Sequence, residues 1–214
     1  MELLEAIRQR RAVRDYKPDA VKNADLRLLI EAATWAPSAM NEQPWRFVVV
    51  TDRALLETIS RRSKNWLLDN GAVIARNEHL GAMLRDADFH IFHHAPALIA
   101  IAAADDVKWT IEGCALAAEN LMLAATELGL GTCWIGLAQD WLNSAEGRQM
   151  LKLAPTDGVV APIIVGHPKA SIPPVPRKAP RVTWIGRGEA PVSEDGGESE
   201  SDGQQGLYST LIHP

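Results

Sequence analysis

Residues 113–136 read GCALAAENLMLAATELGLGTCWIG, and this stretch decides the fold class. Apolar residues recur every three or four positions from 110 to 128, a spacing that predicts one long helix with a buried face. Small residues dominate this face, so a second helix can approach it closely. Gly129 is placed as the C′ residue of the helix, and TCWIG (132–136) then predicts a strand. A long helix that leads directly into a strand indicates a mixed architecture.

The other predicted elements mix strands and helices without a strict βαβ order. Asn23 and Asp52 are placed to cap helices, and Asn143 with Glu146 resembles a capping box. This mixture predicts an α+β protein with a central sheet flanked by helices. The expected strands are 46–51, 97–103 and 159–166, and the expected helices are 2–10, the segments after Asn23 and Asp52, parts of 64–90 with a break near Gly71, and 144–153.

The composition of the chain limits its possible functions. It has 214 residues, of which 47% are hydrophobic, enough for one large domain. A net charge of −5 argues against a general nucleic-acid binder or a basic membrane-surface protein. Two cysteines, no signal-peptide h-region and no run of 18 apolar residues favour a cytoplasmic protein without a membrane span.

The character of the sequence changes near residue 186. SEDGGESESDGQQG (193–206) is acidic and polar and has no core-forming residue. We therefore expect a folded domain over residues 1–185 and a flexible acidic tail over residues 186–214. The last residues, LYSTLIHP, could dock elsewhere, for example on a partner subunit.

Four arginines crowd the end of the first predicted helix: Arg8, Arg10, Arg11 and Arg14. Arg10 and Arg14 are four apart and share a face if the helix continues. A guanidinium group suits phosphate because its planar fork donates two hydrogen bonds to an oxyanion. The alternative is a solvated helix end, since charge runs are usually solvated.

A second basic point lies far away in the sequence. GHPKASIPPVPRK (166–178) is rich in proline, which stiffens a segment, and it ends in Arg177 and Lys178. These two side chains and the N-terminal arginines could converge on one phosphate. A simple solvated loop is the alternative.

The loop APSAMNEQPW (36–45) is the third candidate element. Ser38, Asn41 and Gln43 offer both donors and acceptors, and Pro44-Trp45 closes the loop. Such a set suits the edge of a ring with alternating N–H and C=O groups, such as an isoalloxazine or a pyrimidine. The alternative is a loop that ends a helix and packs its tryptophan.

Other motifs argue against other chemistries. GLGTCWIG (129–136) is not G-x-G-x-x-G and follows a helix, which disfavours a Rossmann site, although its glycines could bring backbone amides close to a flat ligand. His90, His93 and His94 could ligate a metal beside Asp86 and Asp88, but a defined ligand set is lacking, so we expect no metal site. The P-loop, G-x-S-x-G and H-E-x-x-H motifs do not occur.

Four segments, in the same order over roughly residues 4–180, resemble the nitroreductase family. IRQRRAVRDY (7–16) is similar to its opening R-R-S-x-R-x-[FY], and APSAMNEQPWRFVVV (36–50) to its A-P-S-x-x-N-x-Q-P-W-x-F-x-V-V motif. Residues 113–136 resemble its core helix and Gly-rich strand, and residues 159–178 its C-terminal segment. The resemblance implies an α+β fold with a mostly antiparallel sheet and a domain-swapped-style homodimer with two FMN sites at its interface.

The resemblance also implies the cofactor-binding residues. Arg10 and Arg11 would contact the phosphate and ribityl region, and Arg14 would approach the N1/O2 edge of the ring. Arg177, with Lys178, would complete the phosphate clamp. The partner chain would supply a set of loop residues, and two residues after the Gly-rich strand would lie near flavin N5 through backbone N–H groups. The loop residues from the partner chain would be Pro37, Ser38, Ala39 and Asn41. The two residues near flavin N5 would be Ile135 and Gly136.

One position among these departs from the family pattern. Ala12 stands where the family usually has serine. A hydrogen bond to the phosphate or ribityl group should therefore be missing, at a cost of about 1 kcal/mol if nothing replaces it.

The function that the resemblance implies is electron transfer from NAD(P)H to a small acceptor, such as a nitroaromatic or a quinone, by alternating turnover. The flavin performs the hydride transfer, so no catalytic acid–base pair is required, and Arg14 would tune the ring. No nucleic acid or membrane partner is expected. The alternatives are a flavin-fragmenting or reductively dehalogenating relative on the same fold, or a non-catalytic flavin-binding protein.

Overall fold

The computed structural model describes residues 1–70, 78–104 and 107–186. Contacts divide the chain into two units, residues 1–174 and 175–214. The acidic tail lies outside the described residues from 187 onward, and so does the expected helix break at Gly71. No described helix is long and apolar enough to cross a membrane.

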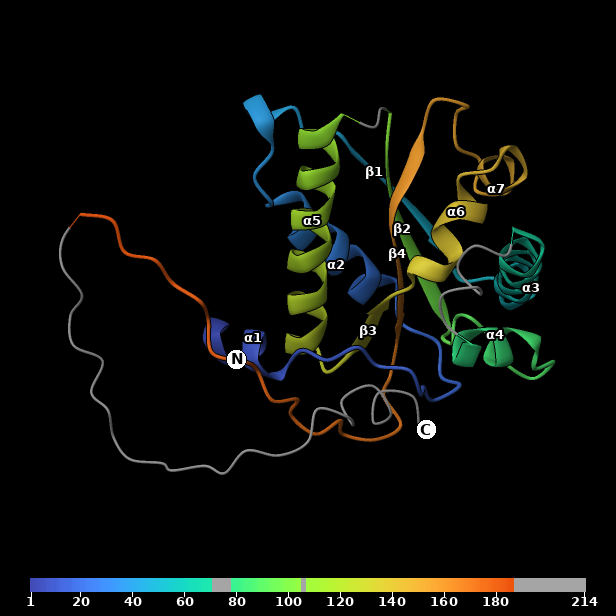
Figure 1. Ribbon diagram of the computed structural model, residues 1–214, viewed down its shortest axis with the longest axis horizontal. Helices are drawn as coiled ribbons and strands as arrows, with labels where there is room; N and C mark the ends of the chain where they lie inside the picture. The colour runs from blue at the N-terminus through green and yellow to red at the C-terminus, as the bar shows by residue number, and fades with distance from the viewer. Residues whose placement is uncertain (71–77, 105–106, 187–214) are drawn as a thin grey trace. The chain divides into compact units, whose positions relative to one another are not determined.

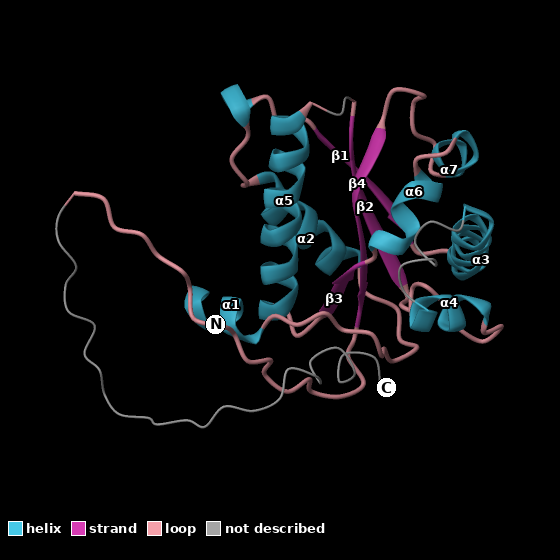
Figure 2. Ribbon diagram, viewed as in Figure 1, coloured by secondary structure: helices cyan, strands magenta, loops and turns pink. Residues whose placement is uncertain are grey.

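A four-stranded antiparallel sheet forms the centre of the first unit (Figure 2). Every neighbouring pair of strands is antiparallel, which confirms the expected α+β class. The two central strands are buried along almost their whole length, and this explains why their sequences are continuously apolar. In spatial order the strands are β1 (Trp45–Val50), β2 (Ala97–Ala103), β4 (Gly158–Gly166) and β3 (Gly131–Trp134).

Helices cover both faces of the sheet (Figure 1). One face carries α2 (Asn23–Thr34) and α5 (Lys108–Glu127), with α1 (Leu3–Gln9) packed on α5. The other face carries α3 (Arg53–Asn70), α4 (Glu78–Arg85), α6 (Gln139–Leu142) and α7 (Ala145–Met150). The sheet therefore lies between two apolar cores, and its strands contribute side chains to both. In β2, for example, Leu98 and Ala100 face one core, whereas Ile99 and Ile101 face the other.

The long helix α5 forms as its sequence predicts. Its buried positions include Gly113, Cys114, Ala117 and Ala118, and α2 packs closely against it. Gly129 follows at φ +69°, a left-handed conformation that glycine adopts at little cost. The expected C-terminal cap of the helix is therefore confirmed.

One expected N-terminal cap forms and another does not. Asp52 does cap α3, because its Oδ1 accepts hydrogen bonds from the amides of Ala54 and Leu55 at 2.8 and 3.2 Å. The prediction for Asn23 was wrong: α2 begins at Asn23 itself, and the capping position is Lys22, whose side chain makes no cap. The apolar face of this helix stabilises it without a side-chain cap.

The expected capping box was also wrong. Ser144 caps α7, and its Oγ accepts a hydrogen bond from the amide of Gly147 at 3.1 Å. Asn143 instead bonds the backbone of Val159 twice, donating to its oxygen at 2.9 Å and accepting from its nitrogen at 2.7 Å. The register of β4 shifts beside Val159, so a side-chain amide supplies bonds there that a regular ladder would otherwise supply.

The N-terminal segment continues the sheet beyond β3. Ala12 pairs with Thr132 in a parallel bridge, and the amide of Val13 donates to the Thr132 oxygen at 2.9 Å. Further along, Tyr16 pairs with Pro168 in an antiparallel bridge. Residues 10–16 are thus held in an extended path along the edge of the sheet.

A close contact between the side chain of Val13 and the backbone of Gly131 fixes this path. A Cβ atom at Gly131 would lie 2.6–2.9 Å from three side-chain atoms of Val13, which is buried. Only glycine therefore allows the N-terminal segment to approach β3 this closely.

We expect Gly131→Ala to lower the free energy of unfolding by about 1–3 kcal/mol, because the added methyl group overpacks against the β-branched Val13. Urea denaturation measures the effect. Gly136→Ala is the matched control, since a Cβ there would meet no atom within 4 Å and should change stability little. Equal stability of both variants would contradict the tight fit at Gly131.

Candidate functional site

Arg10 and Arg14 lie on one side of the extended N-terminal segment. Helix α1 ends at Gln9, so the helical face that these arginines would share if the helix continued does not form. They share a side because extended backbone alternates its side chains with a period of two. Arg10 Nε lies 3.2 Å from Glu119 Oε1 of α5 but is not aligned for a hydrogen bond.

Arg11 points to the other side of the segment. Its Nε donates to the Pro173 oxygen at 3.2 Å, and its Nη1 donates to the oxygens of Arg8 and Arg10 at 2.6 and 2.8 Å. Together with Val13 it lines a cavity of about 650 Å³ away from Arg10. Adjacent residues of an extended chain face opposite ways, and the contact of both Arg10 and Arg11 with the phosphate and ribityl region stays a prediction.

Arg10 and Arg14 both act electrostatically on the thiol of Cys133. Burial raises the pKa of the Cys133 thiol, and the charges of Arg14 and Arg10 act against that rise. Both guanidinium groups therefore lie close to this residue of β3. No sequence pattern indicated this proximity, because Cys133 is far from either arginine along the chain.

His93 also borders this region. Burial, followed by the charge of Arg14, lowers the pKa of His93 to about 4, so the imidazole is neutral near pH 7. His93 has a φ of +49° and packs the edge of its ring against Phe89, with 5.8 Å between the ring centroids. Arg14 is thus bordered by a buried thiol and a neutral imidazole, and no ion pair to Arg14 occurs among the described residues.

Ile135 and Gly136 follow β3 directly. The amide of Ile135 donates to the Pro162 oxygen at 2.8 Å, and the expected place of Ile135 near flavin N5 stays a prediction. Gly136 begins the short helix η3 (Gly136–Ala138), and a Cβ there would meet no atom within 4 Å. Within the described structure its amide has no acceptor, which leaves one of the two expected backbone donors in place.

The loop between α2 and β1 is held in a specific shape. The amide of Gln43 donates to Ser38 Oγ at 3.0 Å and closes the loop, which leaves the hydroxyl hydrogen of Ser38 available to donate. Met40, Asn41 and Gln43 have φ values of 52°, 56° and 49°, which non-glycine residues rarely adopt. Met40 is 91% exposed. Conformations of this kind persist where surrounding contacts enforce them, and they concentrate at functional sites.

This loop and the two arginines do not meet within one chain. Pro37 and Ser38 pack beside Gly113, near the start of α5, whereas Arg10 reaches Glu119 in the middle of that helix. Figure 1 shows the loop and α1 toward opposite ends of α5. No hydrogen bond or ion pair between the described residues joins the two segments. Ala39 and Asn41 belong to η1 (Ala39–Asn41), which lies within this loop.

The remaining expected cofactor-binding residues are Ala12, Arg177 and Lys178. Ala12 is exposed beside Arg10 and Arg14, and only its backbone takes part in the bridge to Thr132. Arg177 and Lys178 belong to the second unit, where Arg177 Nη1 donates to the Val175 oxygen at 3.4 Å. The predicted clamp between Arg177 and the N-terminal arginines spans the two units and stays a prediction.

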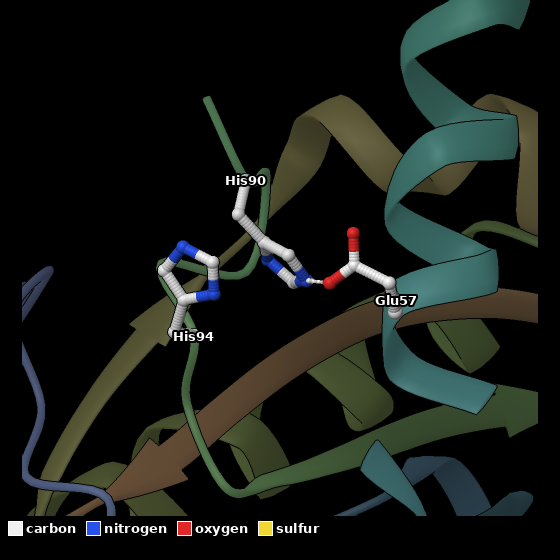
Figure 3. A group of neighbouring side chains, drawn as sticks. All are labelled: Glu57, His90 and His94. Carbon is white, nitrogen blue, oxygen red and sulfur yellow. Dashed lines mark ion pairs between the residues drawn. The ribbon is translucent and has the colours of Figure 1, made fainter. Parts of the chain in front are cut away.

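A separate cluster of titratable groups lies between α3 and the turn that precedes β2: Glu57, His90 and His94 (Figure 3). Their nearest ligand atoms all lie within 4.8 Å of one another. The sequence pointed to Asp86 and Asp88 as neighbours of these histidines, whereas the carboxylate comes from Glu57 on α3. No local spacing could have indicated a partner that lies so far upstream.

Comparisons with known sequences agree with this picture. The model of the Nitroreductase family matches residues 7–167. A protein of Methanothermobacter thermautotrophicus, provisionally named NADH dehydrogenase/NAD(P)H nitroreductase, is 31% identical over 126 residues, which span 57% of this chain and 54% of that protein. The chain thus spans about half the length of the curated relatives that it matches.

Comparisons with solved structures extend over more of the chain. A Bacteroides fragilis nitroreductase with bound FMN has a TM-score of 0.76 and 28% identity, covering 86% of this chain and 99% of that chain. An oxidized iodotyrosine deiodinase bound to FMN and 3-iodo-L-tyrosine has a TM-score of 0.69 and 25% identity with the same coverage of both chains, 86% and 99%. Both relatives hold the same cofactor on this fold.

The neutral state of His93 makes stability depend on pH. The unfolded chain protonates His93 near pH 6.5 and the folded chain near 4, so the free energy of unfolding falls as pH drops through this window. The loss is at most about 3 kcal/mol. His93→Gln should flatten this part of the curve measured by urea denaturation from pH 7 to 4, whereas His79→Gln, at an exposed position, should not. Parallel curves for wild type and His93→Gln would refute the assignment.

Proposed function

The chain belongs to the nitroreductase family, and on this premise we propose that it is an FMN-dependent oxidoreductase that passes electrons from NAD(P)H to a small acceptor. A nitroaromatic or a quinone is the expected class of acceptor. The observation that carries the proposal is that Arg10 and Arg14 both act electrostatically on Cys133, in the strand that leads to the open Gly136 turn. Structural relatives with bound FMN support the choice of cofactor.

The residues on this side fit FMN by their chemistry. FMN carries a phosphate of nearly two negative charges and a ring edge of alternating donors and acceptors. Arg10 and Arg14 supply cationic donors, and Gly136 supplies a backbone amide with open space around its Cα. Arg10 would hold the phosphate and ribityl end, and Arg14 the N1/O2 edge of the ring. Arg11 is proposed for the same end of FMN, where the phosphate would replace the carbonyl oxygens that accept from its guanidinium in the single chain.

Each residue then has a distinct task. FMN, when bound, supplies the hydride chemistry. Arg14 would stabilise negative charge at the ring edge, and an exposed side chain with no ion partner in the described structure is free to do so. Gly136 would leave one ring face open, where NAD(P)H and the acceptor bind in turn. No acid–base pair of this chain is assigned.

A second copy of the chain would complete the site. The loop between α2 and β1 lies near the start of α5, whereas α1 lies toward its other end, so we assign Pro37, Ser38, Ala39 and Asn41 to the flavin of the partner. Ser38 would donate its hydroxyl hydrogen, because Gln43 occupies the oxygen as an acceptor.

Apolar side chains at the surface support a homodimer. On α1 and α5 a band of large apolar side chains is solvent-exposed in the single chain, with Leu3 and Leu4 at 65% and 64%. Large apolar side chains exposed on two helices that pack together favour a surface that a partner covers. The band comprises Leu3, Leu4, Ile7, Trp109, Ile111 and Leu116. The chain has only two cysteines and both are buried, which suits the reducing cytoplasm as the site of action.

A second candidate function is reductive dehalogenation. The similarity to an iodotyrosine deiodinase over 86% of this chain favours dehalogenation over flavin fragmentation. Release of iodide from 3-iodo-L-tyrosine under anaerobic reduction, with poor turnover of nitroaromatics and quinones, would support this function instead.

The visible spectrum of purified protein tests the proposal. We expect a yellow protein that anaerobic NAD(P)H bleaches and that a nitroaromatic or quinone restores. Arg14→Ala should slow the bleaching about 10- to 100-fold, as expected for loss of a charge-assisted hydrogen bond worth about 1.5–3 kcal/mol.

Arg27→Ala removes an equally exposed arginine from α2 and serves as the matched control. Both variants should unfold at wild-type urea concentrations. A protein that takes up no FMN would refute the proposed function, and unchanged bleaching by Arg14→Ala would refute the role of Arg14.

A further inference from the structure

One face of α3 is bonded to the segment that precedes β2. Glu57, Ser60 and Lys64 are spaced three and four apart, so they line the same side of the helix. Glu57 Oε2 lies 3.1 Å from His90 Nε2, and Ser60 Oγ accepts from the amide of Ile91 at 3.0 Å. Lys64 Nζ donates to the backbone oxygens of residues 86 and 89 at 2.6 and 2.7 Å. These three side chains therefore bond α3 to residues 86–91.

The hydrogen bonds of His90 fix its tautomer. The amide of Phe92 donates to His90 Nδ1 at 3.1 Å, so Nδ1 carries a lone pair and the ring proton sits on Nε2. Nε2–H can then donate to the Glu57 carboxylate, as Figure 3 shows. A proton on Nδ1 would face the Phe92 N–H, donor against donor. Ligation of a metal through Nε2 would have the same result, because it moves the ring proton to Nδ1.

Helix α3 and the turn 90–95 border the proposed flavin site from two directions. Helix α3 packs against η3, the short helix that begins with Gly136. The turn 90–95 carries His93, which Arg14 influences electrostatically, and leads into β2. His93 and His94 both have left-handed backbone, with φ of 49° and 54°, so this turn needs contacts that enforce its shape.

We propose that His90 is a positioning residue, whose neutral Nε2–H form ties α3 to the turn 90–95 and thereby holds Gly136 and His93 in place around bound FMN. This inference rests on the proposed function. His90 is 6% exposed in its side chain and does not itself approach the arginines of the site. It acts through Glu57 on one side and the Phe92 amide on the other.

The bonds of His90 to Glu57 and to the Phe92 amide depend on pH through the charged and titratable groups around the imidazole. Burial lowers the pKa of His90, Glu57 opposes this effect, and His94 and Lys64 add to it. The ring of His94 lies 4.5 Å from that of His90 between centroids. Below its pKa the neutral form of His90 falls about tenfold per pH unit, and the bond from Phe92 is lost with it. The titratable and charged groups that face His90 are Arg53, Glu57, Lys64, His93 and His94.

FMN dissociation constants from pH 7.5 to 5 test the inference. His90→Gln keeps an amide donor for Glu57 and does not titrate. It should bind FMN within about threefold of wild type at pH 7.5 but weaken less than wild type in acid. Glu57→Gln should move the wild-type weakening to lower pH, since the carboxylate raises the pKa of His90. His79→Gln, the exposed control, should follow wild type.

Two measurements on the protein without FMN separate this inference from the proposed function. Imidazole ¹⁵N shifts should show His90 with its proton on Nε2 at pH 7.5, and the Phe92 amide should lose protection from hydrogen exchange as His90 protonates. Identical pH profiles for wild type and His90→Gln would overturn the inference. So would stoichiometric Zn²⁺ binding that Glu57→Gln and His94→Gln both abolish. Failure of wild type to bind FMN, with the His90 tautomer as described, would overturn the proposed function alone.

Discussion

The alignment of residues 10–14 with the edge of β3 is the constraint on which the site depends. A parallel bridge at Ala12 and the bond from Val13 hold the backbone extended, and Gly131 allows the close approach. Extended backbone then separates neighbouring side chains. Arg10 and Arg14 turn toward Cys133, while Arg11 turns toward the cavity on the opposite side. A one-residue slip would exchange these sets and remove both cations from the site.

The same geometry explains why the site is incomplete in one chain. The cations and the Gly136 amide lie at the edge and end of β3, whereas the polar loop after α2 packs near the start of α5. Closing the loop with Ser38 and Gln43 and holding three residues in left-handed backbone costs free energy in the single chain. In the proposed homodimer, contacts of this loop with the flavin of the partner subunit would offset that cost. The apolar band on α1 and α5 supplies a surface for the association.

Sequence patterns predicted the parts of the molecule that depend on local physics. The apolar runs located all four strands, the small residues of α5 indicated close helix packing, and Gly129 marked the end of α5. Sequence patterns failed where contacts between distant segments of the chain decide the local structure. Asn143, for example, bonds the backbone of Val159 in β4 instead of capping a helix. The pairing of Glu57 with His90 left no local pattern at all, since it joins a helix to a distant turn.

Complementation between two inactive chains tests the central claim most directly. One chain carries Arg10→Ala with Arg14→Ala, and the other carries Ser38→Ala with Asn41→Ala; each is purified alone, and the two are then mixed under conditions that exchange subunits. If the loop of one chain serves the flavin of the other, each mixed dimer contains one intact site, and NAD(P)H-dependent bleaching returns to at most about half of wild type per dimer. If both sets serve one site within a single chain, the mixture stays inactive, and the account is contradicted.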